Sequence, residues 1–133
     1  MHFRLFYFHK FKLMEKITVV LGASPNPERY SNRAVRKLLE KHIPVVAIGK
    51  KESEIETVSI RKGMPDIGTV HTVTLYLNAK NQEEYYDYIL SLNPKRVIFN
   101  PGTMNEEFEE ILRKEDIEVV TDCMLAMLVC GQF

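Results

Sequence analysis

Residues 17–21 read Ile-Thr-Val-Val-Leu, and residues 22–31 read Gly-Ala-Ser-Pro-Asn-Pro-Glu-Arg-Tyr-Ser. The first part is a short apolar run typical of a buried strand, and a helical pattern begins at about Asn32. A buried strand that leads through small residues into a helix is typical of anion sites in α/β proteins, because a helix N-terminus offers unpaired N–H groups and a positive dipole. The loop lacks the second and third glycines of the dinucleotide motif GxGxxG. It therefore predicts an anion site of another kind.

The rest of the sequence alternates strands with helices. We predict strands at residues 17–21, 44–48, 70–77, 96–99 and 118–120, an edge pairing near 58–60, and helices at 32–42, 81–92, 103–114 and 123–130. The predicted N-terminal caps of the four helices are Ser31, Asn81 with Glu84, Thr103 with Glu106, and Asp122. This alternation predicts an α/β fold whose parallel sheet is covered on both faces.

In such a sheet the ligand lies beyond the C-terminal ends of the strands. The residues that follow the five predicted strands are Gly22-Ala23-Ser24, Gly49-Lys50-Lys51, Asn78-Ala79, Asn100-Pro101-Gly102-Thr103 and Thr121-Asp122. Most of them are small, polar or basic. We therefore predict a pocket along this edge of the sheet.

The chemistry of the first two loops favours a phosphorylated ligand. Residues 22–24 allow close approach of the backbone, Pro25 and Pro27 stiffen the loop, and the guanidinium of Arg29 suits a diphosphate. A tight turn without a ligand is the alternative. An acidic residue after the second strand binds the ribose of NAD, whereas this chain has Lys50 and Lys51, which suit NADP or another nucleotide with an extra phosphate. Solvated surface lysines are the alternative.

Size and composition exclude several classes of protein. A chain of 133 residues forms one domain, and its net charge of zero argues against a general nucleic-acid binder. No apolar stretch approaches the roughly 20 residues of a membrane span. Cys123 and Cys130 are about 10 Å apart along a helix, too far to form a disulfide. We expect a cytoplasmic protein with reduced thiols and no metal site.

The first thirteen residues differ in composition from the rest. They contain four phenylalanines, three basic residues and no acidic residue. We interpret residues 1–13 as a leader from a misplaced start, with Met14 as the natural start and residues 14–133 as the domain. An arm that packs on a partner chain and a weak membrane-surface segment are the alternatives.

Catalytic motifs are few. The sequence has no HExxH, no GxSxG and no evident Cys–His pair. Asp122 and Cys123 follow the last strand, near the predicted pocket. We interpret Asp122 as a helix cap rather than an acid or base, and Cys123 as a structural thiol rather than a reactive one.

Several of these segments together resemble a known family. The segments are Val19–Pro27, Arg29-Tyr30-Ser31, Pro101-Gly102 and Val119–Met124. They resemble the small stand-alone CoA-binding domain proteins, which are similar to the CoA-binding domain of the succinyl-CoA synthetase α-subunit. The resemblance extends from about Lys16 to Cys130. It implies a Rossmann-like three-layer fold with a five-stranded parallel sheet.

The resemblance also implies a ligand, coenzyme A or an acyl-CoA, and a set of site residues. Gly22, Ala23, Ser24, Pro25 and Ser31 would hold the phosphates with Arg29 and Tyr30, Gly49 and Lys50 would lie near the adenosine, and Asn78, Pro101 and Gly102 would line the pantetheine path. The chain departs from many members after its second strand, where Ala47-Ile48-Gly49-Lys50 replaces Pro-Val-Asn-Pro, and after its third, where Tyr76-Leu77-Asn78 replaces Phe-Arg.

From these observations we expect a binding protein without catalysis of its own. A small enzyme that uses NADP or acyl-CoA, with Cys123 or Asp122 taking part, is one alternative. A regulatory subunit of a larger acyl-CoA enzyme is another. The sequence leaves open both a homodimer and a partner enzyme subunit.

Overall fold

The computed structural model describes residues 16–133, so the predicted leader and start residue lie outside the described residues. At its centre is a seven-stranded sheet with the strand order β3-β4-β2-β1-β5-β6-β7. The strands are β1 (Thr18–Leu21), β2 (Val45–Ile48), β3 (Ser53–Ile55), β4 (Val58–Arg61), β5 (Thr72–Leu75), β6 (Arg96–Phe99) and β7 (Glu118–Thr121). Every neighbouring pair is parallel except β3 with β4. The predicted α/β class is confirmed.

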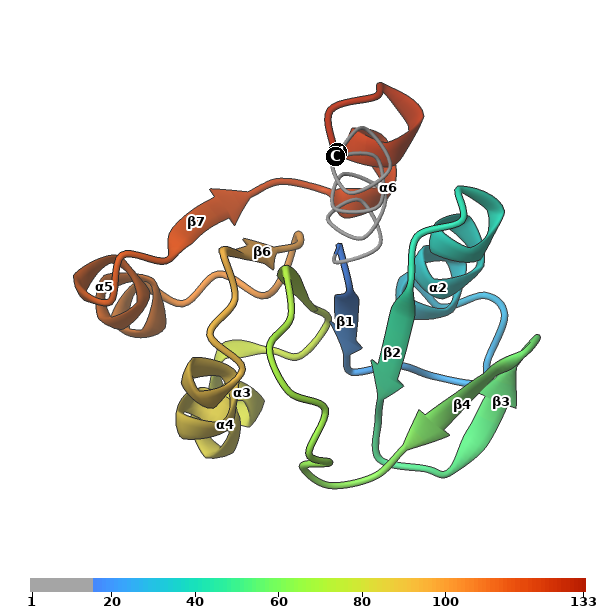
Figure 1. Ribbon diagram of the computed structural model, residues 1–133, viewed down its shortest axis with the longest axis horizontal. Coiled ribbons are helices and arrows are strands. Elements are labelled where there is room, and N and C mark those ends of the chain that lie inside the picture. The colour runs from blue at the N-terminus through green and yellow to red at the C-terminus, as the bar shows by residue number, and fades with distance from the viewer. Residues whose placement is uncertain (1–15) are drawn as a thin grey trace, which may run out of the picture.

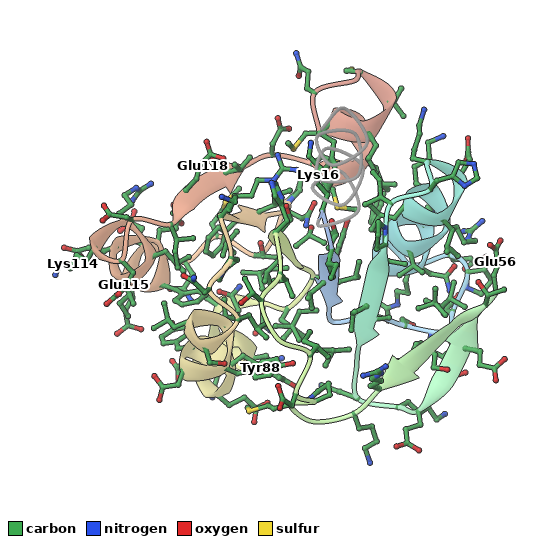
Figure 2. All side chains as sticks on the ribbon, in the orientation of Figure 1. Lys16, Glu56, Tyr88, Lys114, Glu115 and Glu118 are labelled. Carbon is green, nitrogen blue, oxygen red and sulfur yellow. The ribbon has the colours of Figure 1, made fainter. Side chains whose placement is uncertain are left out.

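The predicted number of five strands is wrong. The five expected strands are present as β1, β2, β5, β6 and β7, and a hairpin of β3 and β4 extends the sheet beyond β2. The hairpin turns at Glu56, which has a φ of 53° and lies at the tip of β3 and β4 in Figure 2. Each of its short strands buries one apolar side chain, Ile55 or Ile60. Because each strand has only one buried apolar residue, the sequence pattern predicts an edge pairing near residue 58 and does not predict a hairpin.

Helices cover both faces of the sheet, as Figure 1 shows. They are α2 (Tyr30–Glu40), α3 (Ala79–Gln82), the 3₁₀ turn η1 (Glu83–Tyr85), α4 (Tyr86–Ser91), α5 (Glu106–Lys114) and α6 (Met124–Val129). Helices α2 and α6 bury Leu38 and Met124 against one face, and α4 and α5 bury Ile89 and Phe108 against the other. Among the described helices, none is long and apolar enough to cross a membrane.

The structure corrects the predicted start of the first helix. The helix begins at Tyr30 instead of Asn32, and Arg29 occupies the N-cap position without a side-chain capping bond. Ser31 is therefore the second residue of the helix and is buried, so the prediction that it caps the helix is wrong. The helix ends near its predicted position.

The other predicted caps are also displaced. Asn78 caps α3, because its Oδ1 accepts a hydrogen bond from the N–H of Asn81 at 2.9 Å. Asn105 caps α5 by accepting from the N–H of Phe108 at 3.1 Å. At each site an asparagine lies two or three residues away from the predicted cap. Polar residues are common at helix starts, and which of them is the cap depends on where tertiary packing starts the helix.

The long connection between β4 and β5 is held by α4. The hydroxyl of Tyr88, which Figure 2 labels on α4, donates a hydrogen bond to the carbonyl oxygen of Pro65 at 2.6 Å. This contact joins a segment without regular structure to the helical layer. The connection begins beside the end of β2, where Arg61 pairs with Ile48, and leads to Thr72 at the start of β5.

Candidate functional site

A groove of about 630 Å³ lies at the C-terminal ends of four parallel strands. Its lining residues in the described chain follow β1, β2, β5 and β6: Gly22, Ala23, Ser24, Pro25, Arg29, Tyr30, Ser31, Gly49, Lys50, Lys51, Tyr76, Leu77, Asn78, Asn81, Glu84, Tyr85, Pro101, Gly102 and Thr103. The structure thus brings all twelve predicted site residues to one groove. The strand order reverses between β1 and β5, and this is where open α/β sheets bind ligands.

Two glycines let the strand ends come into contact. Gly22 has a φ of 100°, and a Cβ there would lie 2.9 Å from the carbonyl carbon and oxygen of Tyr76. A Cβ on Gly49 would overlap the carbonyl oxygen of Ala23. Because neither position has room for a side chain, the loops after β1, β2 and β5 form one continuous floor of the groove.

The first loop does not offer its earliest N–H groups to a ligand. The N–H groups of Gly22 and Ala23 both donate to the carbonyl oxygen of Ile48, at 2.8 and 2.9 Å. This differs from a loop in which the glycine itself binds the anion. The two residues instead shape the groove and join it to β2.

Free donors are found at the start of α2. The backbone N–H groups of Tyr30, Ser31 and Asn32 donate a hydrogen bond to no backbone or side-chain acceptor in residues 16–133. The first turn has no acidic residue, and the exposed guanidinium of Arg29 directly precedes it. An eleven-residue helix therefore begins at the groove with its positive end and three unpaired donors, and two of the residues that carry them, Tyr30 and Ser31, line the groove.

Two residues that we did not predict hold this loop in place. The amide of Asn32, which is 3% exposed, donates to the carbonyl oxygen of Ser24 at 2.9 Å. Arg36 donates to Oδ1 of Asn32 at 2.8 Å and to the carbonyl oxygen of Pro27 at 2.9 Å. The signal in the sequence was weak, an asparagine and an arginine four residues apart on one helix.

Charge is divided between the two ends of the groove. Arg29, Lys50 and Lys51 follow β1 and β2. Among the described lining residues, Glu84 is the only acidic one, and it comes from η1, which follows β5. Since β1 lies between β2 and β5, the basic end and the acidic end are on opposite sides of the central strand.

A buried polar network fixes the far end of the groove. Gln82 is fully buried, and its Nε2 donates to the carbonyl oxygens of Leu77 and Thr103, both at 2.8 Å. Its Oε1 accepts from Nδ2 of Asn105 at 2.9 Å. One side chain thus joins the loops that follow β5 and β6. In the sequence, Gln82 is one of several polar residues on an amphipathic segment, and nothing in the pattern indicates that it is buried.

The residues after β7 lie outside the groove. Asn100 accepts a hydrogen bond from the N–H of Met124 at 2.9 Å and directs α6 to the face that α2 covers. Cys123 rather than Asp122 is the N-cap residue of α6, so the predicted Asp122 cap is wrong. Neither residue lines the groove.

The floor of the groove contains a tyrosine with an unusual environment. The hydroxyl of Tyr76 is buried and has no hydrogen-bond partner among the described residues. Burial raises the pKa of this phenol well above its ordinary value, and the nearby Cys123 raises it further. The phenol is therefore a neutral donor at physiological pH.

The sequence matches one known protein family, and the fold matches several solved structures. A family model described as a CoA binding domain matches residues 16–129. A crystal structure of an uncharacterized protein is 48% identical, with a TM-score of 0.86 over 89% of this chain and 98% of that chain. A hypothetical protein from Pyrococcus horikoshii OT3 is 27% identical, with a TM-score of 0.75 over 90% and 84%. A Thermus thermophilus protein, cell-free ID.343, is 22% identical, with a TM-score of 0.79 over 96% and 97%. No curated protein matches.

Proposed function

The chain belongs to the CoA-binding domain family, and on that premise we propose that its groove binds coenzyme A or an acyl-CoA without transforming it. The observation that carries the proposal is the uncapped start of α2, with its three unpaired N–H groups beside Arg29. This arrangement favours a diphosphate, because helix N-termini bind anions through backbone donors and the helix dipole. The groove volume of about 630 Å³ lies within the usual range of ligand sites.

The charge distribution suggests the direction in which the ligand lies. In the proposed complex the diphosphate of CoA contacts the N–H groups of Tyr30 and Ser31 together with Arg29. The ribose 3′-phosphate lies toward Lys50 and Lys51, beyond Gly49. These basic side chains supply charge that a nucleotide with an extra phosphate requires.

The rest of the ligand follows the strand ends toward β6. Ala23, Ser24 and Pro25 form the wall beside the diphosphate. The pantetheine arm then passes Asn78 and reaches Pro101 and Gly102. From the loop after β1 to the loop after β6 this path is about two strand spacings long, or about 10 Å.

A thermal-shift panel tests the ligand. Coenzyme A at 100 times its Kd is expected to stabilise the fold by about 2.7 kcal/mol, and acetyl-CoA should behave alike. The 3′-dephospho form should bind more weakly, and NAD should give no shift. A clear response to NADP together with none to coenzyme A would overturn the proposal.

Two variants test the assigned contacts. Arg29→Gln is expected to weaken CoA binding about tenfold, since it removes a charge-assisted hydrogen bond. Lys41→Gln, at the exposed C-terminal end of the same helix, is the matched control. The double change of Lys50 and Lys51 to Gln should reduce the affinity for coenzyme A more than that for its 3′-dephospho form.

The same measurements separate binding from the alternatives. A cytoplasmic CoA-binding protein should keep its CoA affinity in Cys123→Ser, because Cys123 lies outside the groove. A loss of affinity in that variant would favour an enzyme in which the thiol takes part. A regulatory subunit would be indicated by a partner chain that co-purifies with the native protein.

A further inference from the structure

We propose that the groove selects acyl groups without a negative charge, and that Glu84 is the residue that makes this selection. The inference rests on the proposed function. It adds to that function the chemical class of the acyl group and the residue that recognises it.

The first step is the position of the acyl end. The unpaired N–H groups of α2 and the three basic lining residues are all at the β1 and β2 side of the groove. The charged nucleotide half of an acyl-CoA is therefore most stable there. The thioester end then lies at the opposite side, among the residues that follow β5 and β6.

The second step is the chemistry of that opposite side. Its described lining consists of Leu77, Asn78, Asn81, Glu84, Tyr85, Pro101, Gly102 and Thr103. Glu84 is the only ionisable carboxylate among them, and no arginine or lysine of the described chain lines this side of the groove. A terminal carboxylate on the acyl group would meet a like charge without a cation to pair with.

The third step is the setting of Glu84 itself. Burial raises the pKa of the Tyr85 phenol, and the nearby carboxylate of Glu84 raises it further. No salt bridge in residues 16–133 involves Glu84, whereas Glu109 and Glu110 on α5 each pair with a basic side chain. Lys80, on the preceding turn, is exposed and does not line the groove. The negative charge of Glu84 therefore remains available to a ligand.

Three thioesters of equal acyl-chain length test the proposal. Butyryl-CoA, succinyl-CoA and 4-(trimethylammonio)butyryl-CoA share a four-carbon acyl chain whose end is neutral, negative or positive. Calorimetry at low ionic strength should give the weakest binding for succinyl-CoA and the tightest for the trimethylammonio compound. We expect about three- to fivefold between neighbouring ligands, as Coulomb's law in water gives for unit charges a few ångströms apart. Added salt should reduce these ratios.

The variant Glu84→Gln should bind all three thioesters with nearly equal affinity. Glu83→Gln changes the adjacent exposed carboxylate, which does not line the groove, and should keep the wild-type order. If the wild type binds coenzyme A but binds the three thioesters with equal affinity, the proposed selectivity is overturned and the proposed function is not. An order that survives in Glu84→Gln would overturn the role of that residue. Absence of binding by coenzyme A and all three thioesters would overturn the proposed function as well.

Discussion

Single residues decide how closely the strand ends approach one another. Gly49 lies against the carbonyl oxygen of Ala23, and Gly22 lies against the backbone of Tyr76. The two contacts differ in cause, because Gly22 also needs a positive φ, whereas Gly49 needs only space. A side chain at either position would separate the loops that form the groove floor.

The contact at Gly49 predicts a large effect of one methyl group. Gly49→Ala is expected to lower the free energy of unfolding by about 3 kcal/mol, because backbone rather than a flexible side chain must move. Urea unfolding measures this change. Gly68→Ala is the comparison, since its Cβ meets no atom within 4 Å and the cost is that of its positive φ alone, about 1–2 kcal/mol. Equal losses in the two variants would contradict the role of close packing.

A histidine at the opposite edge of the sheet predicts pH-dependent stability. Burial, and then the charge of Arg96, lower the pKa of His71 in the folded protein below its usual value of 6.5. The unfolded chain therefore binds the proton more readily. Stability should be highest above about pH 6.5, should fall as pH drops from there toward the folded-state pKa, and should level off below it. Unfolding between pH 7.5 and 5.5 should show a smaller decline in His71→Gln, and an unchanged decline would contradict this cause.

At the scale of elements, the groove depends on how helices and loops are joined. Asn32 and Arg36 hold the first loop to α2, and Gln82 holds together the loops after β5 and β6. Asn105 supports Gln82 from the start of α5. Asn32, Gln82 and Asn105 are buried, and each is stable there because it forms hydrogen bonds.

The junction at Gln82 predicts the cost of removing one amide. Gln82→Leu leaves the carbonyl oxygens of Leu77 and Thr103 without their donor and should destabilise the fold by about 2–4 kcal/mol. Lys80→Leu, an exposed change on the same short helix, serves as the control. Thermal unfolding of both variants provides the measurement. A loss below about 1 kcal/mol for Gln82→Leu would show that water replaces the amide.

At the scale of the whole molecule, parallel register creates the site. Leu21 pairs with Ile48 and with Leu75, and Leu75 pairs with Phe99, so four strands end at one level. β7 ends at the same level opposite Phe99, but its chain turns away into α6. Figure 1 shows α6 beside α2, apart from the layer formed by α3, α4 and α5.

This arrangement predicts where ligand binding changes amide exchange. The N–H groups of residues 30–32 have no acceptor in the described chain, so they should exchange rapidly and become protected when coenzyme A is added. Residues 49–51, 77–85 and 101–103 should gain protection with them. Residues 118–129, which lie outside the groove, serve as an internal reference. Protection confined to this reference segment would place the ligand elsewhere.

The sequence by itself determined the alternation of strands and helices and the segments that follow the strands. These features are local, because an apolar run, an amphipathic period and a small-residue loop can each be recognised within about ten residues. The α/β class and the family were therefore predictable from residues 17–31 and the later strand ends. The twelve predicted site residues all line one groove, because they lie in or next to the loops that follow parallel strands.

Only the tertiary structure decided which backbone donors remain free and which strand end leaves the groove. The N–H groups of Gly22 and Ala23 are taken by Ile48, and the exit of Cys123 is turned away by Asn100. The hairpin at Glu56 and the junction at Gln82 likewise depend on partners outside the local pattern. The physical reason is that these contacts join residues 13 or more positions apart, whose proximity exists only once the sheet has formed.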